Sequence, residues 1–544
     1  MDISNQTNDG VYPSLEADVI IVGGGSAGCL LANRLSENPS LQVILIEAGG
    51  EDKNPWIHIP LGYVKTIADK SVNWCYQTEP AKSLGDRRMH YPLGKVLGGS
   101  SSINGLAWVH SQVEDFDEWE AAAGPDWGRA AMQKALHAVE EVPASLSLSR
   151  GRGPGVKISL ADIEHPLLSA VISAGVSVGL QVNEDYNSGD QSGIGPLQVT
   201  IADGRRVSAV DAFLKPIRRR ANLRVLTSTR VTRILFNGLR ALGVETLSPQ
   251  GRLFVMARRE VVLSAGAIHT PQILSLSGVG PAIDLQRLGI GVRVDLPDVG
   301  KHLQDHVQLR CVYRAQNVNT LNQLFHSKPE KALAIFRYAL NRSGWLAQGA
   351  LRAVAFADSQ ESHSRPDLQL FFSPFSTDQL GGPPHKFPGM SISVIPLRPK
   401  SRGQLTLSSA DIDTPPRIYL PYLENADDMS LALKGIDLAR RIASQSALRP
   451  WLTSEIFPGP EKTDVASLEA FARQQATTIF HPVGTCRMGT DKSSVVDSRM
   501  KVRGIECLRV VDASIMPNIT SGNTNAPTFA LAQRASLILK QDLH

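Results

Sequence analysis

The sequence predicts an α/β protein whose first domain is built on a doubly wound parallel sheet. Three features support this fold class: a largely apolar, β-branched run at residues 18–22, a glycine-rich turn at residues 23–28 and a second such run at residues 43–47. Runs of this kind are typical of parallel strands that are buried on both faces. With the helix that we expect over residues 29–35, the two strands form one βαβ unit of ordinary size.

The glycine-rich turn has the spacing Gly23-x-Gly25-x-x-Gly28, and the second strand ends on a carboxylate at Glu47. Glycines at these positions let the backbone approach a pyrophosphate, whose charge then meets the helix N-terminus. A carboxylate at the end of the second strand can accept ribose hydroxyls, which favours a dinucleotide without a 2′-phosphate. The unit therefore predicts dinucleotide binding, but by itself it does not distinguish FAD from NAD.

The composition is that of a large globular protein. The 544 residues are 42% hydrophobic, and 56 basic and 52 acidic residues leave a net charge of only +4. A chain of this length is expected to form two or more domains, and the balanced charge lacks the basic footprint of a nucleic-acid partner. The five cysteines are scattered without CxxC spacing, which argues against a disulfide framework and a zinc site. We expect no bound metal.

The first fifteen residues are polar and contain aspartates but no lysine or arginine. They therefore lack the charged start and the apolar centre of a signal peptide. The sequence also contains no uncharged apolar stretch of about 18 residues, the length needed to span a bilayer. We expect a cytoplasmic protein without a membrane segment.

Four further segments carry small or polar residues in distinctive order. They are residues 94–105, which are rich in glycine and serine, residues 266–280, residues 481–489, which begin with His481, and residues 512–528, which follow a short expected strand. Taken alone, the first of these could be a flexible turn, and a histidine followed by proline is more often a buried structural residue.

Together with the βαβ unit, these segments resemble the glucose-methanol-choline (GMC) oxidoreductases, a family of FAD-dependent alcohol oxidases and dehydrogenases. The resemblance covers almost the whole chain and implies FAD rather than NAD. It implies a Rossmann-type FAD domain at residues 15–160, 195–310 and 471–544. A substrate domain with a largely antiparallel sheet would occupy residues 311–470.

The resemblance also implies which residues contact FAD. The ADP half would contact Gly23, Gly25, Ser26, Ala27, Gly28, Glu47 and Ala48, with the Val231 backbone near the adenine. The flavin side would contact Gly99, Ser100, Asn104 and Ala107. Asp512 and Ala513 would reach the ribityl and pyrophosphate groups, and Asn525 and Pro527 the pyrimidine edge. Some members attach FAD covalently through a histidine, but the matching position here is Ile103, so we expect non-covalent FAD.

The resemblance implies that His481 is the catalytic base and Asn523 its partner. An alcohol gives up hydride readily only as its hydroxyl proton leaves, and an imidazole can take that proton near neutral pH. Asn523 would donate a hydrogen bond to the same oxygen. Phe371 and Phe480 suggest apolar substrate walls, although each could equally be ordinary core. A hand alignment places Arg352 where choline-oxidising members hold a carboxylate, and a cation there would repel choline.

We therefore expect oxidation of a primary alcohol, neutral or carboxylate-bearing and with aromatic alcohols included, to an aldehyde. The electron acceptor would be O₂, a quinone or a dye, and the enzyme would be a monomer or a homodimer. Four alternatives stay open: a choline-type dehydrogenase, a hydroxynitrile-lyase-like enzyme without net redox change, a light-driven decarboxylase and a flavin-binding protein without catalysis.

Overall fold

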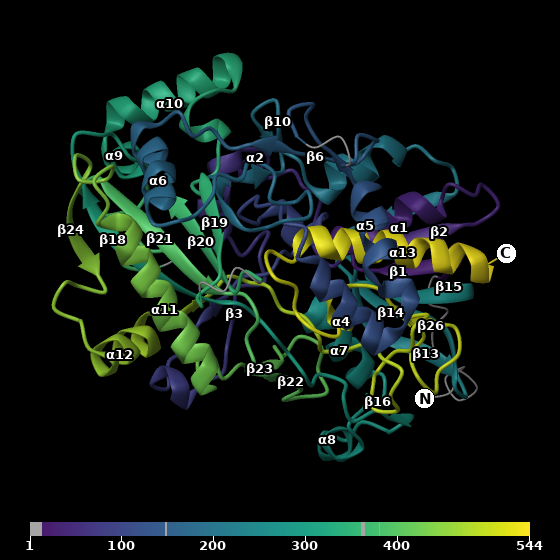
Figure 1. The fold of residues 1–544 in the computed structure, drawn as a ribbon. Helices are drawn as coiled ribbons and strands as arrows, with labels where there is room; N and C mark the ends of the chain where they lie inside the picture. Colours follow the sequence, from purple (N-terminus) through teal and green to yellow (C-terminus); the bar gives the residue numbers. More distant parts are fainter. Residues whose placement is uncertain (1–13, 147–149, 361–364, 380, 544) are drawn as a thin grey trace.

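The computed structural model describes residues 14–146, 150–360, 365–379 and 381–543, and its strands form two seven-stranded sheets. Most of the polar leader, residues 1–13, lies outside the described residues. The two sheets occupy opposite halves of the molecule, and helices cover the outer faces of both (Figure 1). In the part of the chain that is described, no helix has the length and apolar character needed to cross a membrane.

The first sheet is the predicted parallel sheet, extended by an antiparallel pair. Its central strands β12, β2, β1, β15 and β26 run parallel, and β13 and β14 add antiparallel strands beside β15. The predicted runs are both strands of this sheet, and their apolar residues are buried. Its strands are β12 (Leu223–Leu226), β2 (Val43–Ile46), β1 (Ser14–Val22), β15 (Gly251–Leu263), β14 (Arg240–Ser248), β13 (Arg230–Asn237) and β26 (Leu508–Val510).

Two helices far apart in sequence pack side by side on this sheet (Figure 1). Helix α1 (Ser26–Leu35) starts three residues before the predicted boundary, because Gly23 at φ +105° ends the strand in a tight turn. Helix α13 (Asn525–Leu543) comes from the end of the chain, and α5 (Arg129–His137) packs against it.

The second sheet is antiparallel throughout, in the order β24-β18-β21-β20-β19-β8, with β25 also on β18. The predicted fold class is thus confirmed. The predicted domain boundaries stay predictions, and β8 and β25 pair in this sheet although they fall outside residues 311–470. Its strands are β24 (Leu452–Phe457), β18 (Val307–Ala315), β21 (Gly389–Pro396), β20 (Leu368–Ser373), β19 (Ala353–Ala357), β8 (Gly193–Pro196) and β25 (Thr477–Thr478).

Strand alternation gives this sheet two chemically different faces. One face is apolar and packs on helices α11 (Ala426–Ala443) and α6 (Pro166–Ser177), with Leu309 and Ile392 in the shared core. The other face carries polar side chains and points to the centre of the molecule. The remaining α-helices of the described chain are α2 (Pro55–His58), α3 (Tyr63–Thr66), α4 (Val113–Ala123), α7 (Gly266–Leu276), α8 (Ala282–Arg287), α9 (Leu321–His326), α10 (Lys328–Asn341) and α12 (Val465–Gln475).

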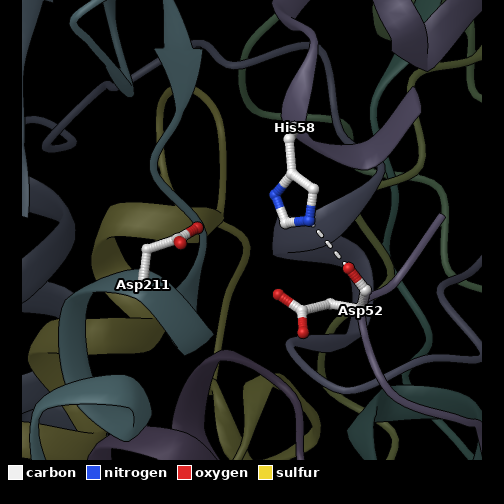
Figure 2. A group of neighbouring side chains, drawn as sticks. All are labelled: Asp52, His58 and Asp211. Carbon is white, nitrogen blue, oxygen red and sulfur yellow. Dashed lines mark hydrogen bonds between the residues drawn. The ribbon is translucent and has the colours of Figure 1, made fainter. Parts of the chain in front are cut away.

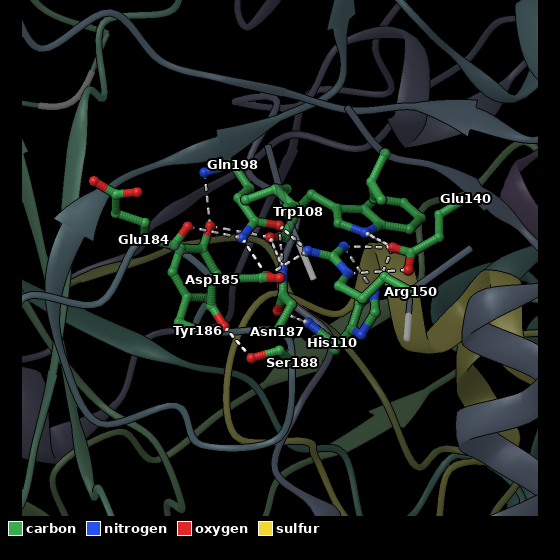
Figure 3. A network of polar contacts seen from close by, with 12 residues as sticks. Trp108, His110, Glu140, Arg150, Glu184, Asp185, Tyr186, Asn187, Ser188 and Gln198 are labelled. Carbon is green, nitrogen blue, oxygen red and sulfur yellow. Dashed lines mark hydrogen bonds and ion pairs between the residues drawn. The ribbon is translucent and has the colours of Figure 1, made fainter. Parts of the chain in front are cut away.

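A buried polar network joins three segments that are far apart in the sequence, residues 108–110, 140–150 and 184–198 (Figure 3). The Glu140 carboxylate accepts hydrogen bonds from Trp108 Nε1 at 3.0 Å, from His110 Nε2 at 2.7 Å and from the Arg150 guanidinium at 2.5 Å. Arg150 also pairs with Asp185 at 2.7 Å. Burial alone would raise the pKa of Glu140, but its contacts with His110 and Arg150 hold that pKa below the ordinary range. The carboxylate is therefore charged and fully paired.

We expect Glu140→Gln to lower the free energy of unfolding by about 3 kcal/mol, because it breaks a buried ion pair and leaves Arg150 with one counter-ion. The urea midpoint of the purified protein measures this loss. A carboxylate with a lowered pKa stabilises the fold above its unfolded pKa, so the difference from wild type should shrink as the pH falls below about 4.3. Glu141→Gln, at the more exposed neighbouring position, should change the midpoint little. Equal midpoints for Glu140→Gln and wild type would refute the role of this network.

Candidate active site

A cavity of about 640 Å³ lies between the two sheets. The carboxyl-terminal residues of β1 and β2, Val22 and Ile46, line it on one side, and the polar face of the antiparallel sheet lines it on the other. Ligands of open α/β sheets bind at the carboxyl ends of the strands, and the volume is in the range of small-molecule and cofactor sites. The position and the size both fit a dinucleotide.

The two glycine-rich segments meet at this cavity. A Cβ on Gly99 would lie 2.8 Å from the Cα of Gly25, and a Cβ on Gly94 would lie 2.2 Å from the carbonyl carbon of Gly99. Side chains at these positions would therefore push the segments apart and fill the space beside them. Gly28 does not line the cavity, but a Cβ there would lie 1.9 Å from the Gly23 oxygen. Its role is to allow α1 to approach the turn closely.

Glu47 lines the cavity at the end of β2, as the βαβ unit predicts. Its two carboxylate oxygens accept hydrogen bonds from the backbone N–H groups of Gly24 at 2.8 Å and Gly49 at 2.7 Å. Burial raises the pKa of Glu47 to about 7. Each oxygen retains a lone pair, which leaves the carboxylate able to accept a ribose hydroxyl.

The N-termini of two helices face the same part of the cavity. Ser26 begins α1 and Asn525 begins α13, both residues line the cavity, and Ser26 Oγ donates a hydrogen bond to Asn525 Oδ1 at 2.9 Å. Unpaired N–H groups and the helix dipole favour a negative charge here, as on a pyrophosphate. The two glycine-rich segments, Glu47 and these helix ends thus fit the two halves of an adenine dinucleotide.

Fourteen of the sixteen residues predicted to contact the cofactor line this cavity. They are Gly23, Gly25, Ser26, Ala27, Glu47, Ala48, Gly99, Ser100, Asn104, Ala107, Val231, Asp512, Ala513 and Asn525. The other two are Gly28, described above, and Pro527, which is buried in the first turn of α13. The contacts that these residues make with FAD stay predictions.

Phe371 and Phe480 also line the cavity, whereas Arg352 does not. The Arg352 Nε donates to the Gly349 carbonyl at 2.9 Å, and its guanidinium stacks on the Trp345 ring at 5.2 Å. Its neighbour Leu351 lines the cavity instead. Arg352 thus lies outside the cavity lining, and its role toward the substrate stays a prediction; on an extended chain, a shift of one residue moves a side chain to the opposite face.

His481 and Asn523 meet at the cavity wall, as the resemblance implies. Asn523 Nδ2 lies 3.2 Å from His481 Nε2, and Asn523 Oδ1 accepts a hydrogen bond from the Gln369 side chain at 3.3 Å. His481 is 8% exposed, and burial, together with neighbouring His306, holds the pKa of His481 well below its usual value. The ring is therefore neutral at pH 7 and can act as a base.

Hydrogen-bond partners assign the tautomer of His481. His306 Nε2 lies 2.9 Å from the Leu397 carbonyl, which can only accept, so this nitrogen carries the proton. Burial lowers the pKa of His306 to about 4, which leaves its Nδ1 unprotonated. His306 Nδ1 lies 2.9 Å from His481 Nδ1, so the latter must donate. The lone pair of His481 is consequently on Nε2, the nitrogen beside Asn523.

A buried carboxylate holds the backbone of His481. Asp305 Oδ1 accepts the His481 N–H at 2.7 Å, and Oδ2 accepts hydroxyl groups from Tyr91 at 2.9 Å and Tyr422 at 2.5 Å. Thr478 supplies a third hydroxyl. Asp305 and His306 directly precede β18, while His481 follows β25, the strand paired with it. The pairing of these strands thus brings His481 together with Asp305 and His306.

Sequence reasoning missed Asp305, His306 and Gln369, which lie outside the recognised motifs. One signal was present: in residues 306–310, histidine, glutamine and arginine alternate with valine and leucine. Such alternation is typical of a strand with one polar and one apolar face. Gln308 and Arg310 do line the cavity.

A second group of polar residues, drawn in Figure 2, is not part of the lining of this cavity. Asp52, His58 and Asp211 hold ligand-type atoms within 4.8 Å of one another, and Asp52 Oδ2 and His58 Nδ1 have no hydrogen-bond partner. Both Asp211 oxygens are already engaged, one by Lys215 at 2.6 Å and the other by Ser208. Two free ligand atoms are too few for a closed metal site, so we assign no metal here.

Family models described as GMC oxidoreductase match residues 17–308 and 399–532. The chain is 40% identical to an alcohol dehydrogenase [acceptor] of Pseudomonas putida over 529 residues, covering 96% of this chain and 95% of the relative. It is 37% identical to the mitochondrial choline dehydrogenase of Homo sapiens, covering 96% and 90%. The structure of pyridoxine 4-oxidase from Mesorbium loti superposes with a TM-score of 0.87 at 32% identity, covering 96% of this chain and 99% of that one.

The matched regions contain both glycine-rich segments, His481 and Asn523, and the relatives are matched over nearly their full length. The sequence is more than 30% identical to these proteins over almost the whole chain, and the fold matches that of a solved relative over the same length. The chain therefore belongs to the GMC oxidoreductase family and is an FAD-dependent oxidoreductase that acts on alcohol-type substrates.

Proposed function

We propose that the protein oxidises a primary alcohol to an aldehyde, with His481 as the base and Asn523 as a hydrogen-bond donor. The observation that carries this proposal is the unprotonated Nε2 of a buried, neutral His481, which faces the cavity beside an amide N–H. A hydroxyl group that replaces the direct contact between these two side chains could give its proton to Nε2 and accept a hydrogen bond from Asn523 Nδ2.

The chemistry divides between the protein and its cofactor. FAD, when bound, supplies the acceptor for the hydride that leaves the carbinol carbon. His481 removes the hydroxyl proton, and general-base assistance of this kind is typically worth about 10² to 10⁴ in rate. Asn523, oriented by Gln369, stabilises the charge that develops on the oxygen.

The choline relatives suggest a second candidate, choline oxidation, but the charges in the cavity disfavour it. Glu47 and Asp512 are the acidic residues that line the cavity within the described chain, and both belong to the cofactor end. The substrate end has Gln308 and the cation Arg310 beside Phe371 and Phe480. A quaternary ammonium would find no carboxylate partner there. Aromatic walls favour an aromatic or otherwise apolar alcohol.

Several further features of this function are also proposals. O₂, a quinone or a dye is the proposed electron acceptor, and the cytoplasm is the proposed location. A monomer or homodimer is the proposed assembly. None of these features enters the chemistry at His481, and each can change without affecting the assignment of the base.

We expect FAD to dissociate when the protein is denatured, because Ile103 stands where some family members carry the attachment histidine. Two histidines line the cavity in the described chain, His269 and His481, and both rings are already hydrogen-bonded. After urea denaturation and ultrafiltration, the flavin absorbance should appear in the filtrate. A covalent flavoprotein treated in parallel controls for incomplete release. Flavin retained with the polypeptide would contradict non-covalent binding.

We expect anaerobic addition of a primary alcohol to bleach the flavin absorbance, and His481→Ala to slow this reduction by about 10² to 10⁴ because the base is lost. A stopped-flow screen of benzylic and furanic alcohols and choline measures the rates. Asn523→Ala should slow reduction less than His481→Ala, because it removes one donor worth about 2.7 to 4 kcal/mol. The FAD content of each variant is the control for folding.

The same screen separates the rival functions. A hydroxynitrile-lyase-like enzyme would leave the flavin spectrum unchanged with every alcohol, because its reaction involves no net electron transfer. Faster reduction by choline than by the benzylic and furanic alcohols would replace our substrate assignment with choline. An unchanged reduction rate in His481→Ala would remove the assignment of the base.

We expect His306→Leu to lower the plateau rate of flavin reduction and to move its acid limb to higher pH. The variant removes the acceptor that fixes the His481 tautomer, and it also removes a neighbour that lowers the pKa of His481. In wild type the rate should fall only well below pH 6.5. His306→Asn, whose amide oxygen can accept from Nδ1, should restore part of the rate. A lowered plateau with an unmoved acid limb in both variants would indicate a purely structural role.

A further inference from the structure

Arg310 is a partly buried cation that faces the cavity without an acidic partner. It lies on β18, on the polar face of the antiparallel sheet, and it lines the cavity that contains His481. Its guanidinium donates a long hydrogen bond of 3.4 Å to the backbone carbonyl of Asp378. No ion pair to Arg310 is found among the described residues. The nearby Asp378 carboxylate accepts instead from His385 at 2.8 Å.

A guanidinium without an ion pair costs folding free energy in this position, because burial removes water and Asp378 acts only as a nearby charge, not as an ion-pair partner. Burial lowers the pKa of Arg310 to about 10, so the group is still charged at neutral pH. By contrast, Arg230, another cation that lines the cavity, pairs with Asp413 at 2.8 Å and lies over the Trp74 ring. A bound anion would therefore supply the ion-pair partner that Arg310 lacks within the described chain.

Strand register places Arg310 in a row of cavity-facing residues. Arg310 lies opposite Ser393 on β21, which in turn lies opposite Phe371 on β20. Neighbouring strands are about 4.8 Å apart, so the backbones of Arg310 and Phe371 are about 10 Å apart. The row thus presents a cation, a hydroxyl group and an aromatic ring to the same space.

The same strand measures the distance from Arg310 to the base. His306 and Arg310 are four residues apart in an extended segment, which corresponds to about 13 Å between their Cα atoms. His306 contacts His481, and Gln308 lies between the two on the same face. Since the side chains of Arg310 and His481 both reach into the cavity, one aromatic ring can occupy the space between them.

We propose that Arg310 binds a carboxylate carried by the substrate at the end opposite to its carbinol group. This inference rests on the proposed alcohol oxidation and narrows its substrate class to hydroxymethyl-substituted aromatic carboxylates. A planar guanidinium presents paired donors that match both oxygens of a carboxylate. Ser393 lies beside the same group, and the ring of the substrate would lie against Phe371.

The experiment compares 4-(hydroxymethyl)benzoate with its neutral amide in the FAD-loaded enzyme, using anaerobic flavin reduction. In wild type the carboxylate should have the lower half-saturating concentration. Arg310→Met should raise that concentration by about tenfold to a hundredfold for the carboxylate, as expected for the loss of a charge-assisted hydrogen bond. For the amide, Arg310→Met should change the half-saturating concentration by less than about threefold. Arg310→Lys keeps the charge but loses the paired donors of the guanidinium, and it should give an intermediate half-saturating concentration for the carboxylate.

Arg314→Met is the matched control. Arg314 lies on the same strand, but its guanidinium stacks on Phe387 outside the cavity. This variant should keep the wild-type preference for the carboxylate. Equal half-saturating concentrations for the carboxylate and the amide in wild type would overturn the proposal, as would an equal effect of Arg310→Met on both substrates.

A binding measurement separates failure of this inference from failure of the proposed function. 4-Methylbenzoate has no hydroxyl group to oxidise, so calorimetric titration reports its binding without turnover. Wild type should bind 4-methylbenzoate more tightly than 4-methylbenzamide, and Arg310→Met should abolish the difference. If this holds while no alcohol reduces the flavin, the carboxylate site stands and alcohol oxidation is wrong. If binding shows no preference while neutral alcohols reduce the flavin, alcohol oxidation stands and the role of Arg310 is wrong.

Discussion

The hydrogen bond between His306 and His481 is the interaction on which the proposed chemistry depends. A neutral imidazole has one donor and one acceptor nitrogen, so a base is useful only if its lone pair points to the substrate. The Leu397 carbonyl fixes the proton of His306, and His306 in turn fixes that of His481. A backbone carbonyl directly after β21 thus decides which nitrogen of His481 can accept a proton.

This arrangement explains why the active site needs both sheets. His481 and Asn523 belong to the segments that surround the cofactor, whereas His306, Gln369 and the Leu397 carbonyl belong to the antiparallel sheet or directly adjoin it. The backbone of His481 is tied to Asp305, which also accepts hydrogen bonds from the hydroxyl groups of Tyr91, Tyr422 and Thr478. The base is therefore positioned where the two halves of the molecule meet, beside the cavity.

The sequence predicted the parts of the site that depend on backbone shape. Glycine spacing after a buried strand has few physical explanations, and Glu47, Gly25 and Gly99 lie at the cavity as expected. Asp305 and His306 escaped prediction because their roles depend on the pairing of β18 with β25, which no local pattern reveals. The position of Arg352 outside the cavity lining has a similar cause, since an alignment without strand register cannot decide which side chain faces the cavity.

Burial of His481 has a cost and a benefit for proton transfer. Desolvation and His306 lower the pKa of His481, and each unit of pKa corresponds to about 1.36 kcal/mol against forming the imidazolium. A buried imidazolium therefore forms readily only when a negative charge develops next to it, as on an alcohol oxygen held by Asn523. Without such a charge, His481 would not take a proton from water and would stay neutral. In the proposed reaction, this coupling ties removal of the proton to departure of the hydride, and it keeps His481 unprotonated between turnovers.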